Sequence, residues 1–245
     1  MQALIILAAA SFATSLITAA VGIGGGLGLL SVMPSFLPVP AVVPLHGVTQ
    51  LFSNASRFLL ERKAADTRRL PAYFSGAVLG AALGYLFIGR VPELYLSAAL
   101  GVFILLCTWT DLVARLGRIV TNFFSLALIQ TFLSLFVASV GLISLPVLIK
   151  QGLPKNKVIA THAMQMSVLH ALKVCAFVAA GFPFIRYWPV VLALVAASTA
   201  GSYCGGFFRN RIPERAGAIA LKAGITFFAL KMIVEVAATS SGIRL

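Results

Sequence analysis

Charged residues are scarce in this chain of 245 residues, which has 19 basic and 6 acidic side chains, 10% of the total. Soluble domains carry roughly 25% charged residues and 45–50% apolar ones, whereas 60% of this chain is apolar. So few charges cannot cover a water-facing surface of this size. The scarcity excludes a soluble cytosolic enzyme and a disordered chain, and it predicts an all-α integral membrane protein in a lipid bilayer.

Cysteine is nearly absent as well. Cys107, Cys175 and Cys204 stand singly in apolar stretches with no CxxC pair, which excludes a disulfide framework. The enzyme motifs HExxH and GxSxG are missing. His162 and His170 are separated by roughly 12 Å of helix rise, too far to chelate one metal ion together. We therefore expect no enzyme, and no catalytic residue, metal or cofactor.

The formal net charge of +13 does not indicate a nucleic-acid partner. A nucleic-acid-binding protein gathers its basic residues on one face, whereas here they form short clusters between long apolar runs. Lys and Arg accumulate in this way in the cytoplasmic loops of membrane proteins. The basic clusters therefore predict membrane topology, and no nucleic acid is expected.

Apolar segments long enough to cross a bilayer recur along the chain, since a span needs about 20 residues. About eight transmembrane helices are predicted: 3–21, 41–60, 71–89, 94–113, 122–149, 158–180, 188–206 and 217–238. The fifth segment is too long for one perpendicular pass and contains Gly141 and Pro146. It therefore predicts a broken helix that turns back, as 3–21 does with the short apolar piece 27–37.

The two halves of the chain repeat one another. Ala20-Val21-Gly22-Ile23 matches Ser139-Val140-Gly141-Leu142. An offset of 116 then pairs equivalent positions: Pro38 with Pro154, His46 with His162, Ala55 with Ala171, and Arg57 with Lys173. The pattern predicts two repeats, 1–115 and 116–245, within one membrane domain.

The basic loops indicate that the repeats are inverted. Twelve of the nineteen basic residues fall in four loops: Arg62, Lys63, Arg68 and Arg69; Arg115 and Arg118; Lys150, Lys155 and Lys157; Arg209, Arg211 and Arg215. An alternating eight-pass model divides the loop charges almost evenly, which the positive-inside rule disfavours. If 119–149 enters and leaves on one side, all four loops become cytoplasmic. We therefore expect inverted repeats, each a broken, re-entrant hairpin followed by three spans, with both termini outside.

The run Gly22-Ile-Gly-Gly-Gly is the most unusual local feature, because glycine weakens a helix by about 1 kcal/mol relative to alanine. Irregular backbone at membrane depth occurs only inside protein or along an aqueous cavity. The amides of Gly24, Gly25 and Gly26 can turn toward an anion, and a helix that begins there adds its positive end. The alternative is close helix packing, as at other seams of small residues.

Two polar stripes lie on predicted spans. His46, Gln50, Asn54 and Arg57 are spaced by four, four and three residues and share one helical face. A second stripe occupies the equivalent span: His162, Gln165, His170 and Lys173. Ionisable groups inside a membrane normally face the protein interior or a water-filled path. Inversion brings the stripes face to face.

Such a pathway contains three histidines, one arginine and one lysine but no carboxylate on either stripe, so it attracts anions. Histidine titrates near neutrality, so the stripes also allow proton coupling. The alternative is that Arg57 and Lys173 extend to the membrane interface and that the histidines bond neighbouring carbonyls.

These residues resemble a known signature. Gly22-x-Gly-Gly-Gly, then Pro34 and Ala41, is similar to the signature of the sulfite exporter TauE/SafE family. The second half repeats it in weaker form as Gly141, Pro146, Gly152-Leu-Pro154 and Ala160-Thr161-His162, with Leu142-Ile143-Ser144 in place of the glycines. The resemblance covers nearly the whole chain. It implies a permease that exports small anions, such as sulfite or organosulfonates, across the bacterial inner membrane.

The leading hypothesis is a multi-pass secondary transporter that exports a small anion of the sulfite or organosulfonate class by alternating access, with protons as one candidate coupling ion. The expected partners are this anion and the bilayer, and the sequence leaves a homo-oligomer open. The alternatives are an anion channel with the same lining and, less favoured, an intramembrane enzyme.

Overall fold

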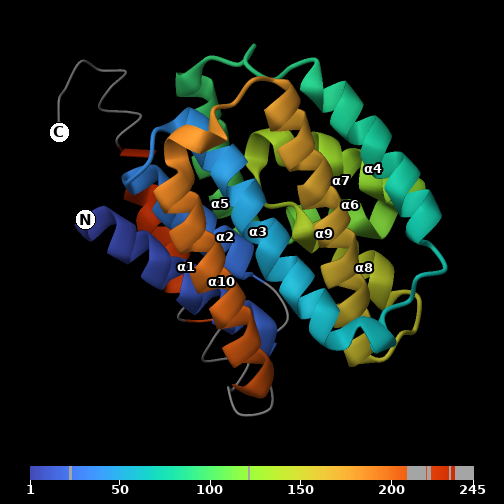
Figure 1. The fold of residues 1–245 in the computed structure, drawn as a ribbon. Helices are drawn as coiled ribbons and strands as arrows, with labels where there is room; N and C mark the ends of the chain where they lie inside the picture. The colour runs from blue at the N-terminus through green and yellow to red at the C-terminus, as the bar shows by residue number, and fades with distance from the viewer. Residues whose placement is uncertain (22–23, 121, 209–218, 220–221, 232, 235–245) are drawn as a thin grey trace.

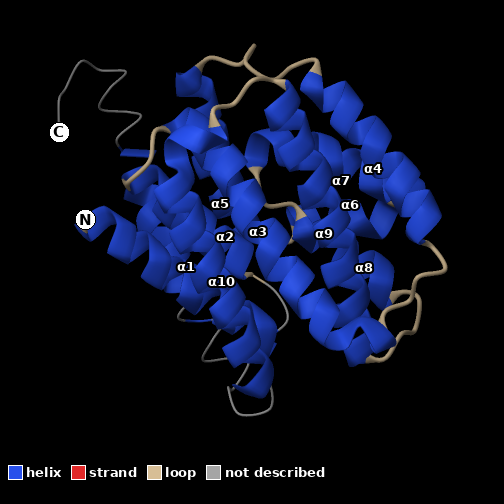
Figure 2. Cartoon of the chain, in the orientation of Figure 1, coloured by secondary structure: helices blue, strands red, loops and turns tan. Residues whose placement is uncertain are grey.

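The computed structural model describes residues 1–21, 24–120, 122–208, 219, 222–231 and 233–234. Helices dominate this part of the chain, and no strand occurs within it (Figure 2). The α-helices are α1 (Gln2–Val21), α2 (Gly25–Val32), α3 (Val39–Glu61), α4 (Leu70–Tyr85), α5 (Glu93–Trp109), α6 (Leu112–Ile119), α7 (Phe123–Val137), α8 (Ser144–Ile149), α9 (Lys155–Ala179) and α10 (Trp188–Phe208). Short 3-10 turns lie between them: η1 (Met33–Ser35), η2 (Arg62–Ala64), η3 (Gly141–Ile143) and η4 (Phe184–Tyr187).

Three described helices are both long and apolar enough to cross a membrane: Gln2–Ala20, Lys155–Ala179 and Phe184–Phe208. Shorter apolar helices are Leu70–Tyr85, Glu93–Trp109 and Phe123–Val137. Residues 222–231, which belong to the last expected span (217–238), are helical. The chain is thus a helical, multi-pass membrane protein, and the count of eight spans stays a prediction.

Both predicted helix breaks are present. α1 and α2 are separate helices, and Gly24 between them adopts a left-handed conformation with φ of 97°. The second break follows Val137, where Ala138 has φ of 62°, and helical structure resumes with η3 and α8. Gly22 and Ile23, the start of the glycine run, lie outside the described residues.

Helices α3 and α9 pack against one another through the middle of the molecule (Figure 1). They run antiparallel, because His46 near the start of α3 lies beside His170 late in α9, whereas the backbone amide of Asp66, just after α3, donates to Thr161 Oγ1 near the start of α9 at 2.9 Å. The two polar stripes on these helices are therefore brought together.

Two further helix pairs flank this centre, α1 with α10 and α4 with α7. Both pairs meet at glycines. A Cβ on Gly205 of α10 would lie 2.3 Å from the carbonyl oxygen of Leu16 in α1, and one on Gly80 of α4 would lie 2.4 Å from that of Leu128 in α7. Small residues allow such close backbone approach in membranes. Close backbone packing at a glycine thus joins α1 to α10, and the same kind of packing joins α7 to α4.

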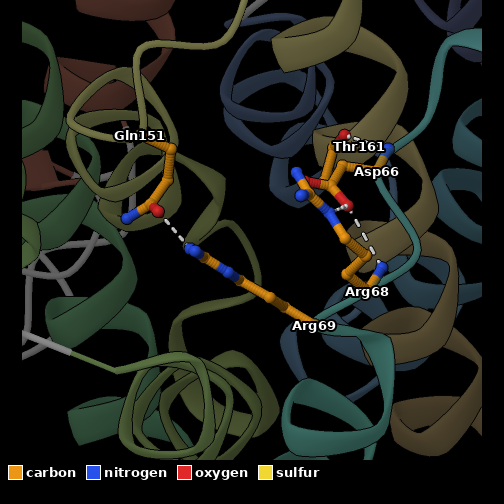
Figure 3. Close-up of polar contacts among 5 residues, drawn as sticks. All are labelled: Asp66, Arg68, Arg69, Gln151 and Thr161. Carbon is orange, nitrogen blue, oxygen red and sulfur yellow. Dashed lines mark hydrogen bonds and ion pairs between the residues drawn. The ribbon is translucent and has the colours of Figure 1, made fainter.

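The basic loops gather at one end of the molecule. Arg69 donates to Gln151, and Arg68 folds onto Asp66, whose backbone contacts Thr161 (Figure 3). The ammonium of Lys150 donates to the carbonyl of Arg118. Three of the four basic loops therefore lie side by side, and the fourth lies outside the described residues.

The opposite end is largely apolar, and Glu93 is the charged residue among the described residues that line its cavity. The turns after α4 and α9 line one cavity of about 320 Å³ together with the start of α3, the start of α5 and the end of α7. Phe87 and Gly89 come from the first of these turns, and Gly181 and Phe182 from the second. The two ends of the helix bundle thus differ sharply in charge.

A candidate anion site between α3 and α9

Side chains of both polar stripes line a single cavity of about 50 Å³. Helix α3 contributes His46, Gln50, Asn54 and Arg57, and α9 contributes His162 and His170. The remaining lining residues are Met166 of α9 and residues of the two helix breaks and the helix ends beside them: Thr18, Gly24, Gly26, Leu27, Ser139, Val140, Gly141 and Leu142. The cavity therefore lies where the breaks of both halves meet the central helix pair.

Two histidines hold the breaks through matching hydrogen bonds. His46 Nε2 lies 2.8 Å from the carbonyl oxygen of Gly26, and His162 Nε2 lies 3.1 Å from that of Gly141. Because a carbonyl oxygen only accepts hydrogen bonds, Nε2 carries the proton in both rings. The expected alternative, in which the histidines bond neighbouring carbonyls, is confirmed for these two residues.

The second nitrogen of each of these histidines is buried without a hydrogen-bond partner in the structure, and the same holds for Nδ1 of His170. The rings of His46 and His170 meet edge to face, with centroids 6.1 Å apart. A buried nitrogen without a partner costs free energy unless a ligand or an ordered water forms a hydrogen bond with it. Three such atoms on residues lining one cavity indicate a polar ligand or water there.

Two cationic side chains are buried beside the histidines. Arg57 is 3% exposed, and its Nη2 donates to Asn54 Oδ1. Lys173 is fully buried, and its ammonium donates to the carbonyl of Ala138 at 3.1 Å. Neither residue reaches the surface, so extension to the membrane interface is wrong for both. None of the described residues that line the cavity carries a carboxylate.

Polar side chains donate to three backbone carbonyls of the second break, two of which, Val140 and Gly141, also accept from the amides of Ile143 and Ser144. Lys173 donates to Ala138, Gln130 Nε2 donates to Val140 at 2.9 Å, and His162 donates to Gly141. Unpaired backbone at membrane depth is costly, and buried partners are needed to tolerate it. The stripe residues therefore stabilise the broken helix as well as lining the cavity.

Helix α2 begins at the cavity, with Gly24 as its N-cap residue. Its first intrahelical bond is donated by Gly28 to Gly24 at 3.2 Å, so the amides of the first turn have no helical acceptor. Gly24 and Gly26 line the cavity. The positive end of a helix therefore lies at the same place as the buried cations.

Three predicted site residues lie outside this lining. A Cβ on Gly25 would lie 1.8 Å from Thr18 Oγ1 and 2.0 Å from the carbonyl oxygen of Thr14, so Gly25 serves close packing of α2 on α1. The side chain of Lys173 passes over Gly47, where an added Cβ would lie 3.3 Å from its Cδ and Cε. Gln165 is buried, and its Oε1 has no hydrogen-bond partner in the structure.

Several lining residues were not predicted as site residues, chiefly Thr18, Ser139, Leu142 and Met166. Ser139 and Leu142 could have been found, because they belong to the segment that repeats Ala20-Val21-Gly22-Ile23. Thr18 and Met166 carry no such signal, since threonine and methionine are common in apolar helices. No cluster of three or more His, Cys, Asp or Glu side chains within the described ranges could hold a metal ion.

Comparison with known proteins gives one finding. A family model described as "Sulfite exporter TauE/SafE" matches residues 7–232, nearly the whole chain. No curated protein matches the chain, and no solved structure matches it.

Proposed function

The chain belongs to the sulfite exporter TauE/SafE family of membrane permeases, and from this premise we propose that it is a secondary transporter that exports a small anion across the bacterial inner membrane. The cavity between α3 and α9 is the proposed substrate site. We propose no enzymatic activity, because the family is one of transporters.

The observation that carries this proposal is the pair of buried cations beside a lining without carboxylates. A buried ammonium such as that of Lys173 costs free energy, which an ion of opposite sign nearby offsets. Within the membrane, the lining and the adjacent Lys173 present guanidinium, ammonium and amide donors and the start of α2. These groups favour an anion and repel cations.

The size of the cavity favours an inorganic oxyanion as the substrate. Its volume of about 50 Å³ is enough for roughly four water-sized positions, which suits one sulfur atom with its oxygens. An organosulfonate with an aliphatic chain needs further space. We therefore propose sulfite ahead of organosulfonates.

Protons are the proposed coupling ion. With Nε2 donating to a carbonyl, a neutral His46 or His162 presents a lone pair at Nδ1, which repels an anion. Protonation converts that atom into a charged donor. In the empty cavity an added proton is opposed by Arg57 and Lys173, whereas a bound anion offsets its charge. Proton and anion binding therefore favour one another.

Inverted repeats, 1–115 and 116–245, account for alternating access in this proposal. Support comes from the antiparallel packing of α3 and α9. It also comes from two matching helix pairs: α1 packs on α10 in the same way that α7, its proposed equivalent, packs on α4. Such repeats place the substrate near the membrane midplane at their interface. Rocking of one half against the other then exposes the cavity to each side in turn.

Transport by purified protein in proteoliposomes tests the function. Uptake of radiolabelled sulfite should saturate, respond to an imposed pH gradient, and be inhibited less by an organosulfonate than by unlabelled sulfite. Lys173→Gln should reduce uptake strongly, whereas Lys157→Gln, which removes an exposed cation outside the cavity, should not. Saturable flux without accumulation under any gradient would indicate the channel alternative, and absence of sulfite flux would contradict the proposal.

A further inference from the structure

Helix α6 has an apolar stripe that the protein does not cover. Leu112, Leu116 and Ile119 are spaced by four and three residues, so they share one face. Their exposed fractions are 52%, 42% and 75%. A short exposed helix with such a stripe is typical of one that lies in the membrane interface.

Basic groups border this stripe. Arg115 and Arg118 are exposed on α6, and neither forms an ion pair with another described residue. Lys150 adds a third cation, since its ammonium donates to the Arg118 carbonyl at the end of α6. Asp111 at the start of the helix is the one acidic residue of this group. The cluster of Arg115, Arg118 and Lys150, hereafter the α6 cluster, is therefore net cationic.

We propose that α6 lies in the headgroup region and that the α6 cluster binds anionic phospholipids. The apolar stripe requires hydrocarbon beside it, and the adjacent guanidinium groups complement phosphate oxygens, which arginine binds in bidentate fashion. The helix also lies at the end of the molecule where the basic loops gather. Anionic lipid is therefore the partner that matches both faces of α6.

The same helix contacts the broken segment of the proposed substrate site. Gly117 packs directly on η3, because a Cβ there would lie 2.1 Å from the carbonyl oxygen of Ile143 and 3.3 Å from Pro146 Cγ. η3 begins at Gly141, whose carbonyl accepts from His162. Bound lipid therefore holds α6 against the turn that positions His162, and it strengthens anion binding. This consequence rests on the proposed function, whereas lipid binding itself does not.

Tryptophan fluorescence tests the lipid surface. Trp109 is 63% exposed and is separated from α6 by two residues. The other tryptophan, Trp188 at the start of α10, is removed by Trp188→Phe. Brominated phosphatidylglycerol should quench Trp109 more strongly than brominated phosphatidylcholine. Arg115→Gln with Arg118→Gln should weaken that preference, by roughly fivefold for each arginine. Arg62→Gln with Lys63→Gln, which removes two charges from a neighbouring loop, should preserve it.

Equal quenching by the two lipids, or an equal loss in both double variants, would overturn the lipid surface. The coupling is tested by sulfite-induced thermal shifts in nanodiscs with and without phosphatidylglycerol. A shift that increases with phosphatidylglycerol only when the α6 arginines are present supports the coupling. A sulfite-induced thermal shift that is the same with and without phosphatidylglycerol overturns the coupling. If sulfite causes no shift in either lipid, the proposed function fails, while the quenching result still decides the lipid surface.

Discussion

His46 and His162 make the same contact in the two halves of the protein: each donates from Nε2 to a glycine carbonyl at a helix break, Gly26 at 2.8 Å and Gly141 at 3.1 Å. The two histidines are 116 residues apart, the offset that relates the halves. Each ring thus secures a break with one nitrogen and leaves Nδ1 without a hydrogen-bond partner in the structure. The pair combines a structural role with a proposed role in anion binding.

Substitution of His162 separates these two roles. Glutamine places an amide near the position of Nε2 and can keep the bond to Gly141, so His162→Gln should fold. It lacks a titratable Nδ1, however, and sulfite should bind roughly ten- to a hundredfold more weakly, the expected loss of one charge-assisted hydrogen bond. Calorimetric titration with sulfite between about pH 5 and 8 measures this loss.

His162→Asn is the matched control, because its shorter amide does not reach the Gly141 carbonyl. We expect it to lower the melting temperature more than His162→Gln does. Wild-type sulfite affinity should increase as the pH falls, and His162→Gln should reduce this dependence. An unchanged pH dependence in His162→Gln together with His46→Gln would contradict proton coupling through these rings.

Lys173→Met should weaken anion binding without harming the fold. Methionine has a similar length and removes a fully buried charge, which favours folding, but it also removes the hydrogen bond to the Ala138 carbonyl, so the melting temperature in sulfite-free buffer should change little. Loss of Coulomb attraction should weaken sulfite binding roughly tenfold. Thermal unfolding with and without sulfite measures both effects. A destabilised variant with normal sulfite affinity would indicate a purely structural lysine.

Gly25 and Gly26 are neighbours with different expected roles. Gly25→Ala should destabilise the protein by roughly 1–3 kcal/mol, because the new Cβ meets the Thr14 backbone at 2.0 Å. The Cβ of Gly26→Ala would lie 3.1 Å from Ser139 Oγ and 3.5 Å from Gln50 Oε1, both side-chain atoms at the cavity. That variant should fold and lose most sulfite flux. We would measure melting temperatures and proteoliposome flux for both variants. If the two variants had the same melting temperature and the same flux, the different roles of Gly25 and Gly26 would be contradicted.

The ion pair in the basic loops should stabilise the folded protein equally throughout the pH range in which histidine titrates. The side chain of Arg68 hydrogen-bonds Asp66 and lowers the pKa of its carboxyl to about 2. A lowered pKa stabilises the folded state above the ordinary carboxyl pKa, and that stabilisation disappears only as the pH falls toward 2. Asp66→Asn should therefore shift the melting temperature by a constant amount between about pH 5 and 8. A melting-temperature shift that varies across this range would contradict the lowered pKa of Asp66.

Much of the cavity lining at the candidate site could be predicted because polar residues are rare in apolar helices. The spacing of His46, Gln50, Asn54 and Arg57 identified the inner face of α3, and the equivalent positions of His162 and His170 identified that of α9. Distances between helices could not be predicted, since the approach of Gly25 to Thr14 depends on how α2 packs against α1. The membrane-span pattern likewise missed α6, which follows α5 after Thr110 and Asp111. Only its first two residues, 112 and 113, fall inside the expected span 94–113.

Sidedness of introduced cysteines tests the inverted arrangement most directly, in a background from which Cys107, Cys175 and Cys204 have been removed. Arg68→Cys and Lys155→Cys lie at the basic end, whereas Arg90→Cys and Arg186→Cys lie in the turns of the apolar end. A membrane-impermeant maleimide should label the second pair in intact cells and the first pair only after permeabilisation. Labelling of Arg68→Cys and Lys155→Cys from opposite sides of the membrane would contradict the account.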